Sequence, residues 1–301
     1  MPKPRYPSTA VKAVLFGLAS QWGAAAMAID VSALWTFSDP ALSEQRFQQA
    51  LADASPDDAF ILRTQIARTW GLRGDFERAR ATLAPLEAEL PKRSAEAKVR
   101  YALELGRTYA SPAHPPETQT PEQRERARPL YLEAFETAKA AQLDRLAIDA
   151  LHMMVMVDSD PADQLAWNIK AITYLEQSTQ ADARKWEGSL RNNIGHAQRL
   201  LGNYDEALRQ FHLSLAAHER DGGPVNVRIA HWMIARTLRD MKRYDEAIAI
   251  QLRLEREWAA AGKDDPYVFE ELEQLYRATG DVARADRYAE RLRGARQRER
   301  Q

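Results

Sequence analysis

The stretch Gly202-Asn203-Tyr204-Asp205-Glu206-Ala207-Leu208 constrains the fold more than any other, because a helical pattern stands on each side of it. In the helix before this stretch, apolar or small residues at 194, 197, 200 and 201 lie on one face. In the helix after it, one face is formed by Ala207, Leu208, Phe211 and Leu215. Gly202 is expected to end the first helix in the left-handed conformation, and Tyr204 to fill the angle between the two helices. The stretch therefore predicts a helical hairpin.

The same pattern recurs along the chain. Further copies begin at Arg73-Gly74-Asp75-Phe76, at Met241-Lys242-Arg243-Tyr244 and at Thr279-Gly280-Asp281-Val282. Recurrence of this kind predicts stacked hairpins, in which each unit buries its apolar face against its neighbours and the whole chain forms one quasi-linear domain. An alanine-rich composition with only 13 glycines in 301 residues also favours an all-α fold.

Three features of the copies carry a resemblance to a known family. A small residue stands in the first helix (Ala67, Gly106, Gly195, Ala235), an aromatic residue at the turn (Phe76, Tyr204, Tyr244), and an alanine after it (Ala79, Ala127, Ala207, Ala247, Ala285). In these features the chain resembles the tetratricopeptide repeat family from about residue 59 to residue 296, most specifically at 189–222. The resemblance implies a right-handed superhelical solenoid of about six stacked antiparallel helical hairpins.

The chain is divided accordingly into a segment of residues 1–28, a capping helix within 29–58 and a solenoid over 59–298. The expected hairpins are 59–91, 95–140 with a proline-rich insertion at 110–121, 143–178, 187–222, 226–263 and 266–298. Asp39-Pro40 is expected to begin the capping helix, and Pro85 to kink the second helix of the first hairpin. The methionines at 153, 154 and 156 are interpreted as core filling.

Residues 1–28 allow two interpretations. Lys3, Arg5 and Lys12 precede an apolar run, and Ala26-Met27-Ala28 is typical of a cleavage site, so the segment has the parts of a secretory signal. Alternatively, translation begins at Met27. We favour the second interpretation, which predicts a cytoplasmic protein, over the first, which predicts a periplasmic or secreted one. The apolar run is too short for a membrane span under either interpretation.

Charge and motifs exclude several classes of function. The chain has 42 basic and 43 acidic residues, so its overall charge indicates no nucleic-acid partner, and the arginines from Arg291 to Arg300 are interpreted as complementing a helix end. It has no cysteine, and its six histidines form no HExxH motif. Asp158, Asp160 and Asp163 lack the rest of a calcium loop and are expected to cap a helix instead. We therefore expect no enzyme activity, cofactor or metal.

The resemblance implies that the first helices line a concave groove. The groove-facing positions hold Arg68, Arg107, His196, Arg236 and Gln274 in one row, and Gly71, Ala110, Arg199, Arg239 and Arg277 in a second. Asn192, Asn193, Trp232 and Tyr267 stand beside them, at positions that contact ligand in peptide-binding members of the family. Arginine binds carboxylates bidentately, and asparagine can satisfy an extended backbone. These residues predict a groove for an acidic peptide, with Trp232, Tyr267 and Leu103 as apolar anchors.

An alternative for the arginine rows is pairing within the protein, with Glu104, Asp240, Glu270 or Glu271 on neighbouring helices. The carboxylate-binding pattern of the family also uses lysines, which this chain lacks at those positions. Three functions follow from these observations: a non-catalytic scaffold that binds a partner segment, a self-assembling structural solenoid, or a small-molecule sensor or enzyme. The sequence favours the scaffold, with a protein or peptide partner and neither membrane nor nucleic acid.

Overall fold

The computed structural model describes residues 29–298, and this span contains helices and no strand. The N-terminal part holds α1 (Val31–Leu34), α2 (Pro40–Ala50), α3 (Pro56–Leu72), α4 (Phe76–Leu83), α5 (Ala95–Arg107), α6 (Pro121–Ala140), α7 (Asp144–Val157) and α8 (Pro161–Gln177). The C-terminal part holds α9 (Ala181–Arg184), α10 (Glu187–Leu200), α11 (Tyr204–Asp221), α12 (Pro224–Asp240), α13 (Tyr244–Ala260), α14 (Pro266–Ala278) and α15 (Val282–Arg298).

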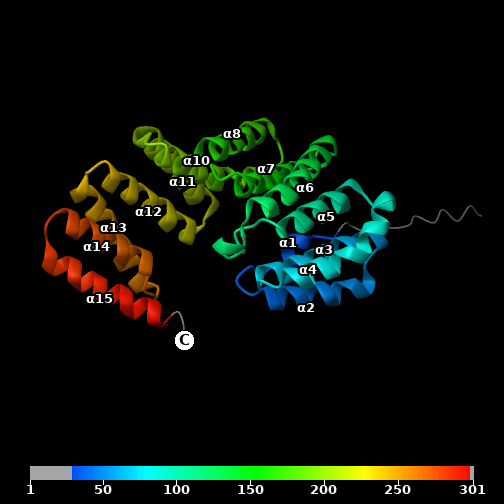
Figure 1. Ribbon diagram of the computed structural model, residues 1–301, viewed down its shortest axis with the longest axis horizontal. Coiled ribbons are helices and arrows are strands. Elements are labelled where there is room, and N and C mark those ends of the chain that lie inside the picture. Colours follow the sequence, from blue (N-terminus) through cyan, green and yellow to red (C-terminus); the bar gives the residue numbers. More distant parts are fainter. Residues whose placement is uncertain (1–28, 299–301) are drawn as a thin grey trace, which may run out of the picture.

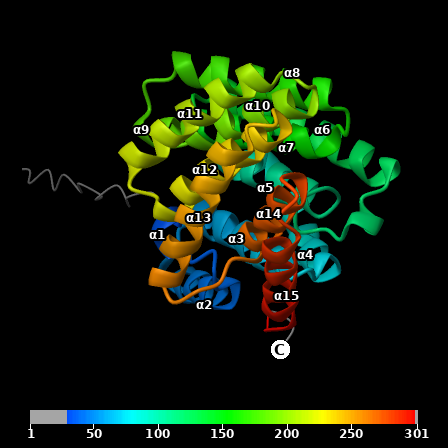
Figure 2. The same ribbon diagram turned by 90° about the vertical axis from the view of Figure 1, so that its left-hand side faces the viewer.

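These helices form a solenoid of antiparallel hairpins that follow one another along an arch (Figure 1). We call α3, α5, α7, α10, α12 and α14 the first helices, and α4, α6, α8, α11, α13 and α15 the second helices. Figure 2 shows the same succession with the C-terminal hairpins toward the viewer. The apolar core is correspondingly divided into clusters along the chain, each shared by neighbouring helices.

The turn at Gly202 has the predicted conformation. Gly202 has a φ of 81°, and Gly74 and Gly280 take the same left-handed conformation at 79° and 80°. In the copy before α13 the position belongs to Lys242, with a φ of 61°, and the turn before α7 uses Gln142 in the same way. The left-handed conformation is therefore common to these turns, although two of them lack the glycine that favours it.

Small residues in the first helices allow the second helices to approach closely. A Cβ atom on Gly195 would lie 2.7 Å from Cε1 of Phe211, which is fully buried on α11. A Cβ atom on Gly106 would lie 2.6 Å from Cε1 of Tyr131 on α6. The second helix thus places an aromatic ring directly against the backbone of the first. Ala207 on α11 is also fully buried.

Several local predictions are confirmed by the helix ends. Asp39 accepts a hydrogen bond from the backbone N–H of Leu42 and begins α2, with Pro40 in its first turn. Of the three aspartates expected to cap a helix, Asp160 accepts a hydrogen bond from the backbone N–H of Ala162 and caps α8, whereas Asp158 pairs with Arg128. Met153 and Met154 are buried in the core, and Met156 packs against it.

Other expectations need correction. The second helix of the first hairpin is not kinked at Pro85, since α4 ends at Leu83 and a 3-10 helix continues from Ala84 to Lys92. Ala110 does not face a groove, because α5 ends at Arg107 and Ala110 is buried. Its carbonyl oxygen accepts a hydrogen bond of 2.5 Å from the hydroxyl of Tyr131.

The two ends of the chain differ in what can be described. Residues 1–28, on which both interpretations of the N-terminus depend, lie outside the described residues. At the other end, Arg296 pairs with Glu270 at 3.0 Å and Arg298 with Asp264 at 2.6 Å. Arg291 pairs with Glu255. Within residues 29–298, no helix combines the length and the apolar character that crossing a membrane requires.

Candidate functional site

Charged side chains join successive first helices in the N-terminal half. Arg107 of α5 donates hydrogen bonds of 2.6 Å to Glu104 on its own helix and of 2.6 Å to Asp149 on α7. Arg68 of α3 reaches the same Glu104 at 3.6 Å. Burial alone would raise the pKa of Asp149, but the guanidinium groups of Arg107 and Arg68 outweigh it and lower this pKa to about 2. Both carboxylates therefore belong to a buried ionic network.

The network affects the arginines in opposite directions. Burial would lower the pKa of Arg107, but Asp149 and Glu104 raise it above its ordinary value. The pKa of Arg68 is lowered, first by burial and then by the charge of Arg107. Arg68 is the less tightly paired of the two, and its guanidinium lies over the rings of Trp35 and Phe37, 5.5 and 5.4 Å from their centroids.

In the middle of the chain, a hydrogen bond between uncharged side chains joins the next two first helices, α7 and α10. The Nδ1 atom of His152 on α7 lies 3.2 Å from the side-chain amide nitrogen of Asn193 on α10. Burial lowers the pKa of His152, so the ring is neutral at pH 7, and Nδ1 accepts the hydrogen bond from Asn193. The imidazole also packs against the indole of Trp186, with ring centroids 5.3 Å apart.

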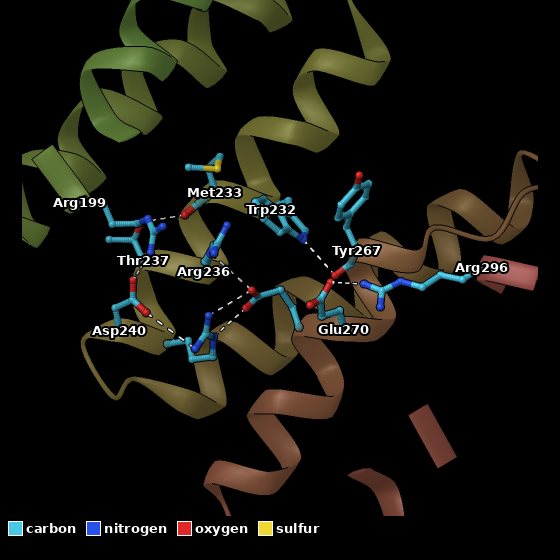
Figure 3. Close-up of polar contacts among 11 residues, drawn as sticks. Arg199, Trp232, Met233, Arg236, Thr237, Asp240, Tyr267, Glu270 and Arg296 are labelled. Atoms are coloured by element: carbon cyan, nitrogen blue, oxygen red, sulfur yellow. Dashed lines mark hydrogen bonds and ion pairs between the residues drawn. The ribbon is translucent and has the colours of Figure 1, made fainter. Parts of the chain in front are cut away.

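Ion pairs join the first helices again in the C-terminal half (Figure 3). Arg199 of α10 donates a hydrogen bond of 2.5 Å to Asp240 of α12. Arg239 of α12 binds Glu271 of α14 through two hydrogen bonds of 2.8 and 3.2 Å. Arg236 reaches the same Glu271 at only 3.6 Å. Three guanidinium groups thus share two carboxylates, which leaves one positive charge in excess.

The predicted arginines therefore lie where the repeat geometry places them, and they contact acidic partners. Glu104, Asp240 and Glu271 were each predicted as internal partners and do pair with them. Glu270 instead pairs with Arg296 of α15. Arg277 stands apart from the others, half exposed, and pairs with Glu273 and with Asp286. Whether these arginines also bind a ligand stays a prediction.

Three other predicted residues, on α5 and α10, are partly or fully buried. His196 is partly buried, and its pKa is lowered by burial and then by the charges of Arg199 and Arg236. The side-chain oxygen of Asn192 is buried and has no hydrogen-bond partner among the described residues. Leu103 was predicted as an apolar anchor, and this is wrong because its side chain is only 1% exposed in the core.

Trp232 and Tyr267 form an aromatic pair at the surface. The indole N–H of Trp232 donates a hydrogen bond of 3.2 Å to the backbone oxygen of Tyr267, and the rings meet edge to face at 6.3 Å (Figure 3). The Tyr267 side chain remains 64% exposed. Beside the pair lies a pocket of about 230 Å³ that Ile229 and Trp258 also line. The guanidinium of Arg236 lies 5.1 Å from the centre of the Trp232 ring.

Sequence reasoning missed a second pocket, which lies in the N-terminal half. It has a volume of about 240 Å³, and its lining includes Glu104, Asp149, His152 and Trp186. A signal for Asp149 was present, since it follows Arg107 by 42 residues as Asp240 follows Arg199 by 41. These separations are close to one repeat, so acidic residues one repeat beyond each arginine could have been predicted as its partners. Among the described residues, no group of histidine and carboxylate side chains is arranged to hold a metal ion.

The fold and these contacts define a helical-repeat solenoid whose first helices are joined by polar side chains. Residues 186–256, which cover α10, α11, α12 and most of α13, match the tetratricopeptide repeat family model. Tetratricopeptide repeats are therefore present in this part of the chain. A search of curated proteins finds no match to this sequence.

Solved structures with the same fold share little sequence with this chain. A signal transduction ATPase with numerous domains and a tetratricopeptide repeat sensor, from Pyrococcus horikoshii, is 16% identical with a TM-score of 0.64. The match covers 85% of this chain and only 38% of that longer one. The apo form of RapI is 11% identical, with a TM-score of 0.59 over 88% of this chain and 73% of that one. A Rap protein in complex with competence and sporulation factor is 15% identical, with a TM-score of 0.56 over 84% and 69%.

Proposed function

We propose that this protein is a non-catalytic scaffold that binds a segment of a partner protein along its first helices, in the concave groove of the solenoid. The tetratricopeptide repeat fold supports this role, because it is typical of proteins that bind other proteins. One protein of the same fold was solved with a bound factor, the Rap protein with competence and sporulation factor. The candidate binding residues lie on α10, α12 and α14.

The excess positive charge among Arg199, Arg236 and Arg239 carries the proposal that the partner segment is acidic. Arg236 is the most weakly paired arginine of the three. Its contact to Glu271 is 3.6 Å, and Arg239 already binds that carboxylate through two hydrogen bonds. Its Nε atom is buried and has no hydrogen-bond partner among the described residues, while 34% of the side chain is exposed. A carboxylate of the partner would satisfy this guanidinium and neutralise the cluster.

The aromatic pair supplies the apolar anchor. An exposed ion pair contributes about 0.2–1 kcal/mol, whereas micromolar affinity needs roughly 8 kcal/mol. An apolar side chain buried in the pocket beside Trp232 and Tyr267 would add about 1.5–3 kcal/mol, and Asn192 can bind backbone groups of an extended segment. The proposed segment therefore carries an apolar or aromatic residue with aspartate or glutamate close to it.

The test is selection from a random peptide display library on the immobilised full chain. We expect enrichment of peptides that combine an aromatic or large aliphatic residue with acidic neighbours, and we expect their binding to weaken as salt rises. Arg236→Ala should remove the acidic preference, and Trp232→Ala together with Tyr267→Ala should remove the apolar one. Arg209→Ala is the matched control, because this exposed arginine lies on α11 and pairs with Glu206.

Two results would contradict the proposal. One is the enrichment of peptides that lack acidic residues altogether. The other is enriched peptides that bind the Arg236→Ala and Trp232→Ala variants as tightly as the parent protein. Circular dichroism of each variant separates loss of the site from loss of the fold.

A further inference from the structure

The pocket in the N-terminal half is a second candidate site, distinct from the surface proposed to bind a partner. It lies between α3, α5 and α7, and its residues at 111–113 belong to the proline-rich insertion that replaces a tight turn. Met153 and Trp186 contribute apolar surface to it. A dry cavity of roughly 150 Å³ holds a benzene molecule. The volume of about 240 Å³ therefore has room for one ring with a short polar group.

Two buried polar atoms beside this pocket lack a partner. Glu104 is only 3% exposed, and its Oε2 atom has no hydrogen-bond donor among the described residues, because Arg107 and Arg68 both approach Oε1. The Nε atom of Arg68 is likewise buried, with no acceptor in the described part of the chain. Both side chains line the pocket. A buried polar group that makes no hydrogen bond is costly, so this acceptor and this donor indicate a ligand that carries the complementary pair.

The balance of charge restricts the ligand further. Arg68 and Arg107 stand against Glu104 and Asp149, two positive charges against two negative ones. His152, which also lines the pocket, is neutral at pH 7. A charged ligand would bring an uncompensated charge into this buried setting, which is unfavourable. This pocket therefore differs from the C-terminal cluster, where one positive charge is in excess.

We propose that this pocket binds a small neutral molecule with an aromatic or other flat apolar body and an amide-type edge. The N–H group of that edge donates to Oε2 of Glu104, and its carbonyl oxygen accepts from Nε of Arg68. The apolar body packs between Trp186 and Met153. The site makes the solenoid a receptor for a small molecule in addition to a partner segment, and it uses none of the residues on α10, α12 and α14 that the proposed function assigns to the partner.

Three compounds with the same ring test this proposal on the full chain: neutral benzamide, anionic benzoate and cationic benzylamine. Binding is followed by the NMR signal of the Trp186 indole N–H, which is assigned with the Trp186→Phe variant. We expect benzamide at millimolar concentration to shift this signal, and the two charged analogues to bind about tenfold more weakly. Equal binding of benzoate or benzylamine, or no shift with benzamide, would overturn the proposal.

Variants separate the site from the fold. Glu104→Gln should weaken benzamide binding about tenfold, whereas Glu96→Gln, a change at a partly exposed residue on the same helix, should leave it unchanged. Because Glu104→Gln could also disturb the ion pairs, Ala113→Phe provides a second variant that fills the pocket from the insertion. It should abolish binding, while Ala141→Phe at an exposed turn should not. Benzamide binding that survives Ala113→Phe would place the compound elsewhere and overturn the proposal.

Discussion

Arg107 on α5 and Asp149 on α7 form an ion pair of 2.6 Å that joins two successive first helices. Arg199 on α10 and Asp240 on α12 repeat this relationship at 2.5 Å, two hairpins further along the solenoid. In each pair the acid follows the arginine by about one repeat. Arginines at groove positions therefore have a structural role, since they hold neighbouring hairpins in register, and the C-terminal set retains an excess of charge.

Removing one member of the buried pair should destabilise the protein strongly. Asp149→Ala leaves Arg107 with Glu104 as its remaining partner in a buried setting, and we expect a loss of about 3 kcal/mol in the free energy of unfolding. Urea denaturation followed by circular dichroism measures this loss. Glu125→Ala, which removes an exposed partner of Arg128, should change the urea midpoint far less. A similar small change for Asp149→Ala would show that the pair contributes little.

The same pair should make stability depend on acid pH. The pKa of Asp149 is about 2 in the folded chain, against an ordinary value of 3.8. Because the folded pKa is depressed, this contribution is fully present above pH 4 and is lost as the pH falls through 2; it amounts to roughly 2 kcal/mol. Unfolding curves of parent and Asp149→Ala should therefore converge between pH 4 and pH 2. Parallel curves throughout that range would contradict the assignment.

A separate pH dependence should arise from His152. Its pKa is lowered from 6.5, mainly by burial, so the unfolded chain binds a proton more readily than the folded one. The stability that the neutral ring contributes is present above pH 6.5 and is lost as the pH falls below that value. His152→Asn should flatten the fall in stability between pH 7 and pH 5, measured by thermal unfolding. The control is His212→Asn, at an exposed histidine, and an equal flattening there would refute the explanation.

Gly195 should tolerate no side chain. Gly to Ala within a helix normally stabilises by about 1 kcal/mol. Here the new Cβ would lie 2.7 Å from the buried Phe211 ring, so we expect Gly195→Ala to destabilise by about 1–3 kcal/mol. Adding Phe211→Leu makes room, and the double variant should lose less than the two single changes together. Strict additivity in chemical denaturation would show that the contact does not matter.

The hairpins themselves could be predicted from local sequence. The helices flanking Gly202 follow from apolar periodicity. The segment 143–178, expected as a hairpin, holds α7 and α8, although the turn before α7 lacks glycine and an aromatic residue. Pro85 was predicted to kink the second helix of the first hairpin, but α4 ends at Leu83 and a 3-10 helix begins at Ala84. Ala110 and Leu103 were placed wrongly, because the proline-rich segment ends α5 early and because the face of α5 that carries Leu103 is covered by core.

The sequence by itself determined which segments are helical, where the chain turns, and which arginines share one face of the first helices. These properties depend on neighbours within a few residues. The tertiary structure alone decided how the arginines are used. Arg236 lies 3.6 Å from Glu271, whereas Arg107 lies 2.6 Å from Asp149. Each of these distances joins side chains on different helices, so it depends on how one hairpin rotates and slides against the next. No local pattern encodes that stacking, so the excess charge and the neutral pocket emerge only when the hairpins are packed.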